Sequence, residues 1–113
     1  MSSIPEPSPL NKGYEVTPLL LDWLQQNGAS DPTISLINAR RLYGLQKYGQ
    51  SLMTEDGRNT MEDAKQEAGD LLQYLYKSFL RGERPSSEDI SQLKEVLKYC
   101  EIVVSILESR IVL

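Results

Sequence analysis

Three carboxylates follow one side of a predicted helix in the middle of the chain. Asp63, Glu67 and Asp70 are spaced i, i+4 and i+7, so a helix places them on one face over two turns. Like charges at this spacing repel one another, so the stripe either stays in water or binds a cation. The chain has no histidine, and oxygen ligands suit Mg²⁺ or Mn²⁺. We therefore expect any metal site to hold Mg²⁺ or Mn²⁺ through these acids.

Each acid also has an interpretation that involves no metal. Asp63 lies in the first turn of the helix, where capping contacts and the helix dipole stabilise an acid. Asp70 stands between Gly69 and two leucines, which predicts partial burial, and a buried carboxylate needs a partner. An ion pair with an arginine or lysine of the preceding helix would satisfy Glu67 and Asp70 without any chemistry.

Four cations precede the acidic helix. Arg40, Arg41 and Lys47 lie on one predicted helix, and Arg58 lies in the loop that joins this helix to the acidic one. One interpretation is a clamp for a polyphosphate, because guanidinium and ammonium groups bind phosphate oxygens. The alternative is a solvated surface on which the arginine stems cover apolar area. The sequence leaves both interpretations open.

Apolar periodicity and cap-type residues predict four helices and no strand of useful length. Thr17 and Ser87 are the expected N-caps of the first and last helices. Residues 1–13 contain three prolines and are predicted to be a flexible arm, so residues 14–113 form a single helical domain. Apolar residues on the last helix cover more than one small core needs, which favours a dimer or larger assembly. The predicted helices cover residues 17–27, 31–48, 59–80 and 88–113.

The length, net charge and composition of the chain exclude several classes of protein. A length of 113 residues fits one domain, and a net charge of −4 leaves no basic surplus for binding nucleic acid. There is no run of about 18 apolar residues and no signal-type start, so we expect no membrane partner and a cytoplasmic location. Cys100 is the single cysteine and lies in an apolar helix pattern, which predicts a reduced, buried thiol.

Three short motifs, taken in order, resemble the all-α nucleoside triphosphate pyrophosphohydrolases. This is the superfamily of MazG-like proteins and dimeric dUTPase-like enzymes, and the short form of this chain is similar to members from phage and other viral genomes. The resemblance covers about residues 33–80. The motifs are Lys47-Tyr48-Gly49, then Glu55-Asp56-Gly57-Arg58, then Glu67-x-x-Asp70 followed by Leu71-Leu72-x-Tyr74-Leu75.

The resemblance implies a fold, a reaction and a set of residue roles. The fold is a four-helix, MazG-like bundle assembled as a homo-oligomer, placed in the host cytoplasm if the chain is viral. The reaction is Mg²⁺-dependent cleavage of a nucleoside triphosphate into a nucleoside monophosphate and pyrophosphate. Glu67 and Asp70 match the metal-binding and catalytic acids, with Asp63 a neighbouring candidate ligand. Lys47 and Arg58 match candidate phosphate contacts, beside Arg40 and Arg41.

One departure from the superfamily keeps two other functions open. The superfamily's preceding helix supplies an acidic cluster, whereas residues 36–49 here contain no aspartate or glutamate. Glu55, Asp56, Glu62 or acids from a partner subunit would have to complete the metal site. Otherwise the chain is a binding protein that holds a nucleotide or another phosphorylated ligand without cleaving it. The third possibility is a helical module whose apolar faces bind another protein.

Overall fold

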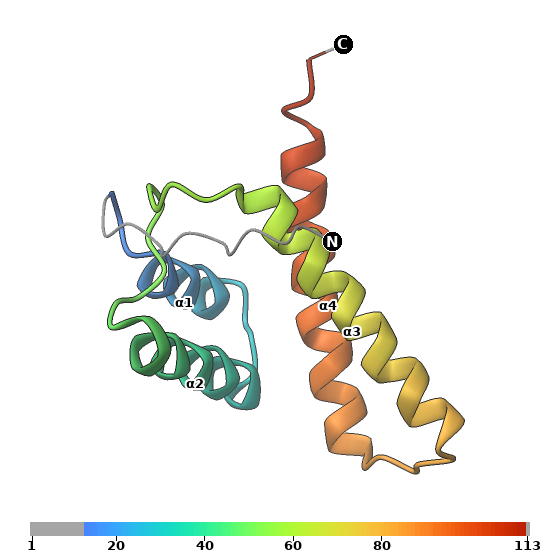
Figure 1. The fold of residues 1–113 in the computed structure, drawn as a ribbon. Helices are drawn as coiled ribbons and strands as arrows, with labels where there is room; N and C mark the ends of the chain where they lie inside the picture. The colour runs from blue at the N-terminus through green and yellow to red at the C-terminus, as the bar shows by residue number, and fades with distance from the viewer. Residues whose placement is uncertain (1–12, 113) are drawn as a thin grey trace.

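The computed structural model describes residues 13–112, and this part of the chain is all-α (Figure 1). It contains no β-strand, only an isolated antiparallel bridge between Glu15 and Met53. The predicted all-α class with four helices is therefore confirmed, whereas the predicted arm lies, apart from Gly13, outside the described residues. The helices are α1 (Val16–Gln26), α2 (Asp31–Tyr48), α3 (Thr60–Leu80) and α4 (Ser87–Glu108).

Local sequence explains where α2, α3 and α4 begin and end. Gly49 ends α2 in the left-handed conformation, with φ of 71°, as its lack of a side chain favours. The Asn59 side chain caps α3 by accepting a hydrogen bond from the backbone N–H of Glu62 at 3.0 Å. Ser86, one residue before the expected Ser87, caps α4.

The start of α1 differs from the prediction because the preceding segment pairs with the loop between α2 and α3. The backbone N–H of Val16 donates to Leu52 O at 2.9 Å, and that of Thr54 donates to Tyr14 O at 2.8 Å. This pairing holds Glu15 in an extended conformation as the N-cap, so Thr17 is not the cap but a buried residue of the first turn. The loop is thereby fastened to α1.

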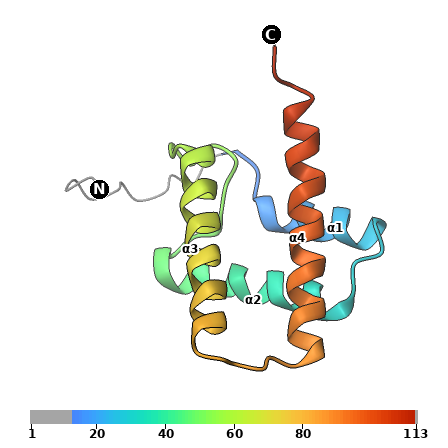
Figure 2. The ribbon, with the colours of Figure 1, turned by 90° about the vertical axis from the view of Figure 1, so that its right-hand side faces the viewer.

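The best-buried part of the molecule lies where α1, α2 and α4 meet. Helix α2 packs against both α1 and α4 (Figure 2). Leu24 of α1 and Tyr99 of α4 are the hydrophobic side chains buried here, with 2% and 7% exposed. The Trp23 and Tyr99 rings meet edge to face with centroids 5.5 Å apart. Trp23 therefore acts as a packing anchor between α1 and α4.

Polar side chains of α4 hold the turn between α1 and α2. The Glu95 carboxylate accepts hydrogen bonds from the Ser30 backbone N–H at 3.0 Å and from the Ser30 hydroxyl at 2.8 Å, at the start of α2. The Tyr99 hydroxyl donates to Asn27 O at 3.0 Å, just past the end of α1. Glu95 thus fixes Ser30, the N-cap residue of α2, whose own side chain makes no cap hydrogen bond to the helix.

Helix α3 is not packed against the other helices in a single chain. No Cα atom of α3 lies within 8 Å of a Cα atom in α1, α2 or α4, and α3 stands apart from α4 as the second arm of an open hairpin (Figure 2). The last turns of α4 extend beyond the other helices (Figures 1 and 2). Cys100 is exposed on α4, so the prediction of a buried thiol is wrong for the isolated chain. Within residues 13–112, every helix is too short or too polar to cross a membrane.

Candidate functional site

Glu67 and Asp70 are held one turn apart on the exposed surface of α3. Both side chains are exposed, and neither makes a hydrogen bond or ion pair with another described residue. The expected partial burial of Asp70 is therefore wrong, because no other helix covers its part of α3. Pairing with Arg40, Arg41 or Lys47, which would satisfy these acids without a ligand, does not occur in the described part of the chain. Both carboxylates are available to a cation from solution.

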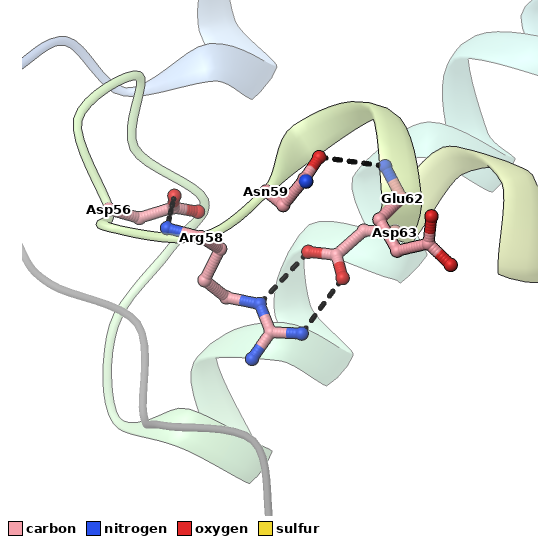
Figure 3. A network of polar contacts seen from close by, with 5 residues as sticks. All are labelled: Asp56, Arg58, Asn59, Glu62 and Asp63. Atoms are coloured by element: carbon pink, nitrogen blue, oxygen red, sulfur yellow. Dashed lines mark hydrogen bonds and ion pairs between the residues drawn. The ribbon is translucent and has the colours of Figure 1, made fainter. Parts of the chain in front are cut away.

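Asp63 is the third acid of the stripe, and it is already paired. Arg58 donates to it through two parallel hydrogen bonds, from Nε to Oδ2 at 2.9 Å and from Nη2 to Oδ1 at 2.8 Å (Figure 3). The hydrogen bonds lower the pKa of Asp63 below its usual value, burial opposes them, and the nearby positive charge of Arg58 adds to the lowering. Two candidate site residues, one assigned to metal and one to phosphate, therefore bind each other.

The loop before α3 places Arg58 for this pairing. Asp56 is buried, and its Oδ1 accepts a hydrogen bond from the Arg58 backbone N–H at 3.1 Å (Figure 3). Gly57 lies between them with φ of 76°, a conformation that favours glycine. The motif from Asp56 to Arg58 therefore forms a tight turn that directs Arg58 towards the first turn of α3. Sequence reasoning noticed each charge but not that an arginine of this turn reaches the acid five residues later.

The cations of α2 divide into two kinds. Arg41 pairs with Glu15, with Nη2 and Oε1 2.5 Å apart, and joins α2 to the start of α1. Arg40 instead lies over the ring of Tyr43, 4.4 Å from its centroid, and Lys47 lies 5.9 Å from the same centroid. Lys47 also lies 5.2 Å from the ring centroid of Tyr48. Arg41 thus has a structural partner, whereas Arg40 and Lys47 are exposed beside aromatic rings.

We call Arg40, Tyr43, Lys47 and Tyr48 the cationic aromatic stripe of α2. Tyr43 and Tyr48 were missed as possible site residues, although the i, i+3, i+7 spacing from Arg40 through Tyr43 to Lys47 places these three on one helix face. Aromatic rings stack on nucleobases and flanking cations bind phosphates. The stripe can therefore bind an anionic ligand that carries a ring.

The donor set limits how a divalent metal can bind. Residues 13–112 contain no group of three or more aspartate, glutamate, cysteine or histidine side chains placed to hold a metal ion. Glu67 and Asp70 supply two carboxylates, and Mg²⁺ is often bound through one or two carboxylates together with substrate phosphates and water. The described residues therefore fit Mg²⁺ as a phosphate-bound ion, and among them there is no closed metal site.

Comparison of the chain with protein-family models, with curated proteins and with solved structures gave no match. The resemblance to the nucleoside triphosphate pyrophosphohydrolases consequently depends on the motifs of residues 47–75 alone. The structure shows which candidate site residues are open to a ligand. Exposed residues are Glu67, Asp70, Lys47 and Arg40, whereas Arg41, Arg58 and Asp63 are engaged in ion pairs.

Proposed function

We propose that this chain is a Mg²⁺-dependent nucleoside triphosphate pyrophosphohydrolase that works in the cytoplasm as a homo-oligomer. Its reaction consumes a nucleoside triphosphate and water and yields a nucleoside monophosphate and pyrophosphate. The observation that carries the proposal is the state of Glu67 and Asp70, which are exposed, adjacent and unpaired within the described residues. Two open carboxylates one helical turn apart can bind a Mg²⁺ ion that also binds the phosphates of a nucleotide.

Glu67 and Asp70 would hold Mg²⁺ through their carboxylate oxygens. The ion, when bound, neutralises phosphate charge and lowers the pKa of a water that it binds. Arg40 and Lys47 would bind the remaining phosphate oxygens, and the ring of Tyr43 offers a surface for the base. Arg58 and Asp63 would position the site without contacting the ligand. Their ion pair fixes the loop to the start of α3 and so fixes the direction in which Glu67 and Asp70 project.

The test measures pyrophosphate release from a panel of nucleoside triphosphates with Mg²⁺ or Mn²⁺, with the melting temperature recorded in the same samples. A ligand that binds only the folded protein raises that temperature by mass action. Glu67→Gln and Asp70→Asn should each abolish release while circular dichroism shows an intact helix content. Glu101→Gln is the matched control, because it also removes one exposed acid, but from α4. Unchanged turnover in both Glu67→Gln and Asp70→Asn would reject the site.

A second function, binding of a nucleotide without cleavage, is favoured by one observation. The described residues place no third carboxylate with Glu67 and Asp70, while the cationic aromatic stripe of α2 is open. Such a protein would be stabilised by the nucleotide without metal and without product. Arg40→Gln and Lys47→Gln would then weaken binding, whereas Glu67→Gln would not.

A further inference from the structure

The outer side of α3 carries an apolar stripe that a single chain leaves in water. Leu72, Tyr76 and Phe79 are spaced i, i+4 and i+7, and Leu72 and Phe79 are 68% and 71% exposed. The rings of Tyr76 and Phe79 touch each other, with centroids 5.5 Å apart, and no other helix covers them. Soluble proteins seldom expose contiguous apolar patches of this kind unless the patch binds something.

The stripe continues into an apolar groove between α3 and α4. The groove has a volume of about 630 Å³, and its walls come from Leu71, Leu75 and Phe79 on α3 and Leu93 and Leu97 on α4. The axes of packed helices lie about 8–10 Å apart, which brings their nearest Cα atoms to about 4–6 Å, whereas no Cα atom of α3 comes within 8 Å of one in α4. The two helices are thus held too far apart to fill the space between them.

The chain exposes more surface than a folded monomer of its mass, and the excess has the size that one partner buries in a dimer. The accessible surface is 9420 Å², against about 6,300 Å² expected for a folded monomer of this mass. Residues 1–12 would account for about 1,900 Å² of the difference even if they were fully extended. About 1,200 Å² remain, more than the roughly 800 Å² that each partner buries in a standard interface.

We propose that a second copy of this chain covers the stripe and the groove, in a two-fold dimer in which α3 packs antiparallel to α3 of the partner. The direction follows from charge. Residues 60–70 carry four acids and one lysine, for a net charge of −3, and residues 71–80 carry only Lys77. A parallel pair would place −3 against −3, whereas an antiparallel pair places −3 against +1.

Side-chain size favours the same direction. The second half of the stripe has the aromatic residues Tyr76 and Phe79, while the first half has Met61, Lys65 and Ala68 on the same face and no aromatic residue. An antiparallel pair sets the rings against these non-aromatic side chains, whereas a parallel pair would set the bulky rings against themselves. By helical spacing the acid pair lies away from the stripe, so the dimer leaves Glu67 and Asp70 open.

The first test is the mass of the native chain in solution, measured by light scattering during gel filtration. We expect a dimer, and Leu72→Asp should abolish it at a concentration where the native chain is fully dimeric. Leu42→Asp is the matched control, because Leu42 is similarly exposed but lies on α2. A monomeric native chain, a dimeric Leu72→Asp variant, or loss of the dimer in Leu42→Asp would each overturn the proposal.

The second test determines direction and does not require a stable monomer. Single cysteines replace Glu62 or Leu80, which are exposed beside the stripe and not on it, in a Cys100→Ser background, and electron resonance measures the distance between spin labels in each dimer. In an antiparallel pair the two distances along the axis add up to about 54 Å for every register in which the two-fold axis crosses α3 between the two positions, because these are 18 residues apart at about 1.5 Å per residue. In a parallel pair both distances would be about 10 Å, which would overturn the proposal.

The inference rests on the homo-oligomer within the proposed function and does not depend on hydrolysis. Native dimers that release no pyrophosphate would reject the hydrolase and leave the dimer in place. Monomers that retain metal-dependent turnover would do the opposite.

Discussion

The ion pair between Arg58 and Asp63 allows a quantitative prediction. Exposed ion pairs contribute about 0.2–1 kcal/mol to stability, and hydrogen bonds to charged groups about 1.5–3 kcal/mol. The Arg58 side chain is 15% exposed and that of Asp63 is 38% exposed, so solvent screens the pair from one side. The bidentate geometry favours the upper end of the exposed range. We therefore expect a coupling free energy of about 1 kcal/mol.

A double-mutant cycle measures this coupling. Asp63→Ala, Arg58→Met and the double variant are unfolded in urea at one protein concentration, since the stability of an oligomer depends on concentration. The cycle removes the other contributions of each side chain, including those that Arg58 makes elsewhere. The double variant should be about 1 kcal/mol more stable than the sum of the single losses predicts.

The same coupling should depend on pH in one direction. The pKa of Asp63 is lowered in the folded state, so the stabilisation is fully present above the unfolded value of about 3.9 and is lost as pH falls through the lower folded value. The coupling should therefore be constant from pH 7 to about 5 and decline below about 4. A coupling below about 0.3 kcal/mol at pH 7, or one that does not change on acidification, would refute the pairing.

Two further predictions concern the contacts of α4. Tyr99→Phe removes the hydrogen bond to Asn27 O and should lower the free energy of unfolding in urea by about 1 kcal/mol. Tyr74→Phe, at an exposed position of α3, should leave it unchanged, and equal effects would show that the hydrogen bond is not the cause. The pKa of Glu95 is lowered, because hydrogen bonds from the side chain of Thr33 and then from the side chain and backbone of Ser30 favour its charged form. Glu95→Gln should therefore destabilise the protein at neutral pH and progressively less as pH falls through the acidic range. A loss that is independent of pH would mean that the charge of Glu95 does not matter.

Much of the fold follows from local sequence. Asn59 and Gly49 marked helix ends correctly, because cap chemistry and the left-handed glycine conformation depend only on neighbouring residues. The start of α1 was missed because the pairing of residues 14–16 with residues 52–54 joins segments far apart in the chain. The regular spacing of apolar residues within a helix contains no information about that pairing.

Residue types at fixed spacings are enough to specify the four helices, the acid stripe and the cations that precede it. Which of these charges are engaged is a property of the folded chain. The fold pairs Arg58 with Asp63 and Arg41 with Glu15, and it leaves Glu67 and Asp70 open. The error on Asp70 has the same origin, because burial depends on what packs against a helix rather than on its own sequence. Within residues 13–112 no helix packs there, since α3 lies apart from the other helices.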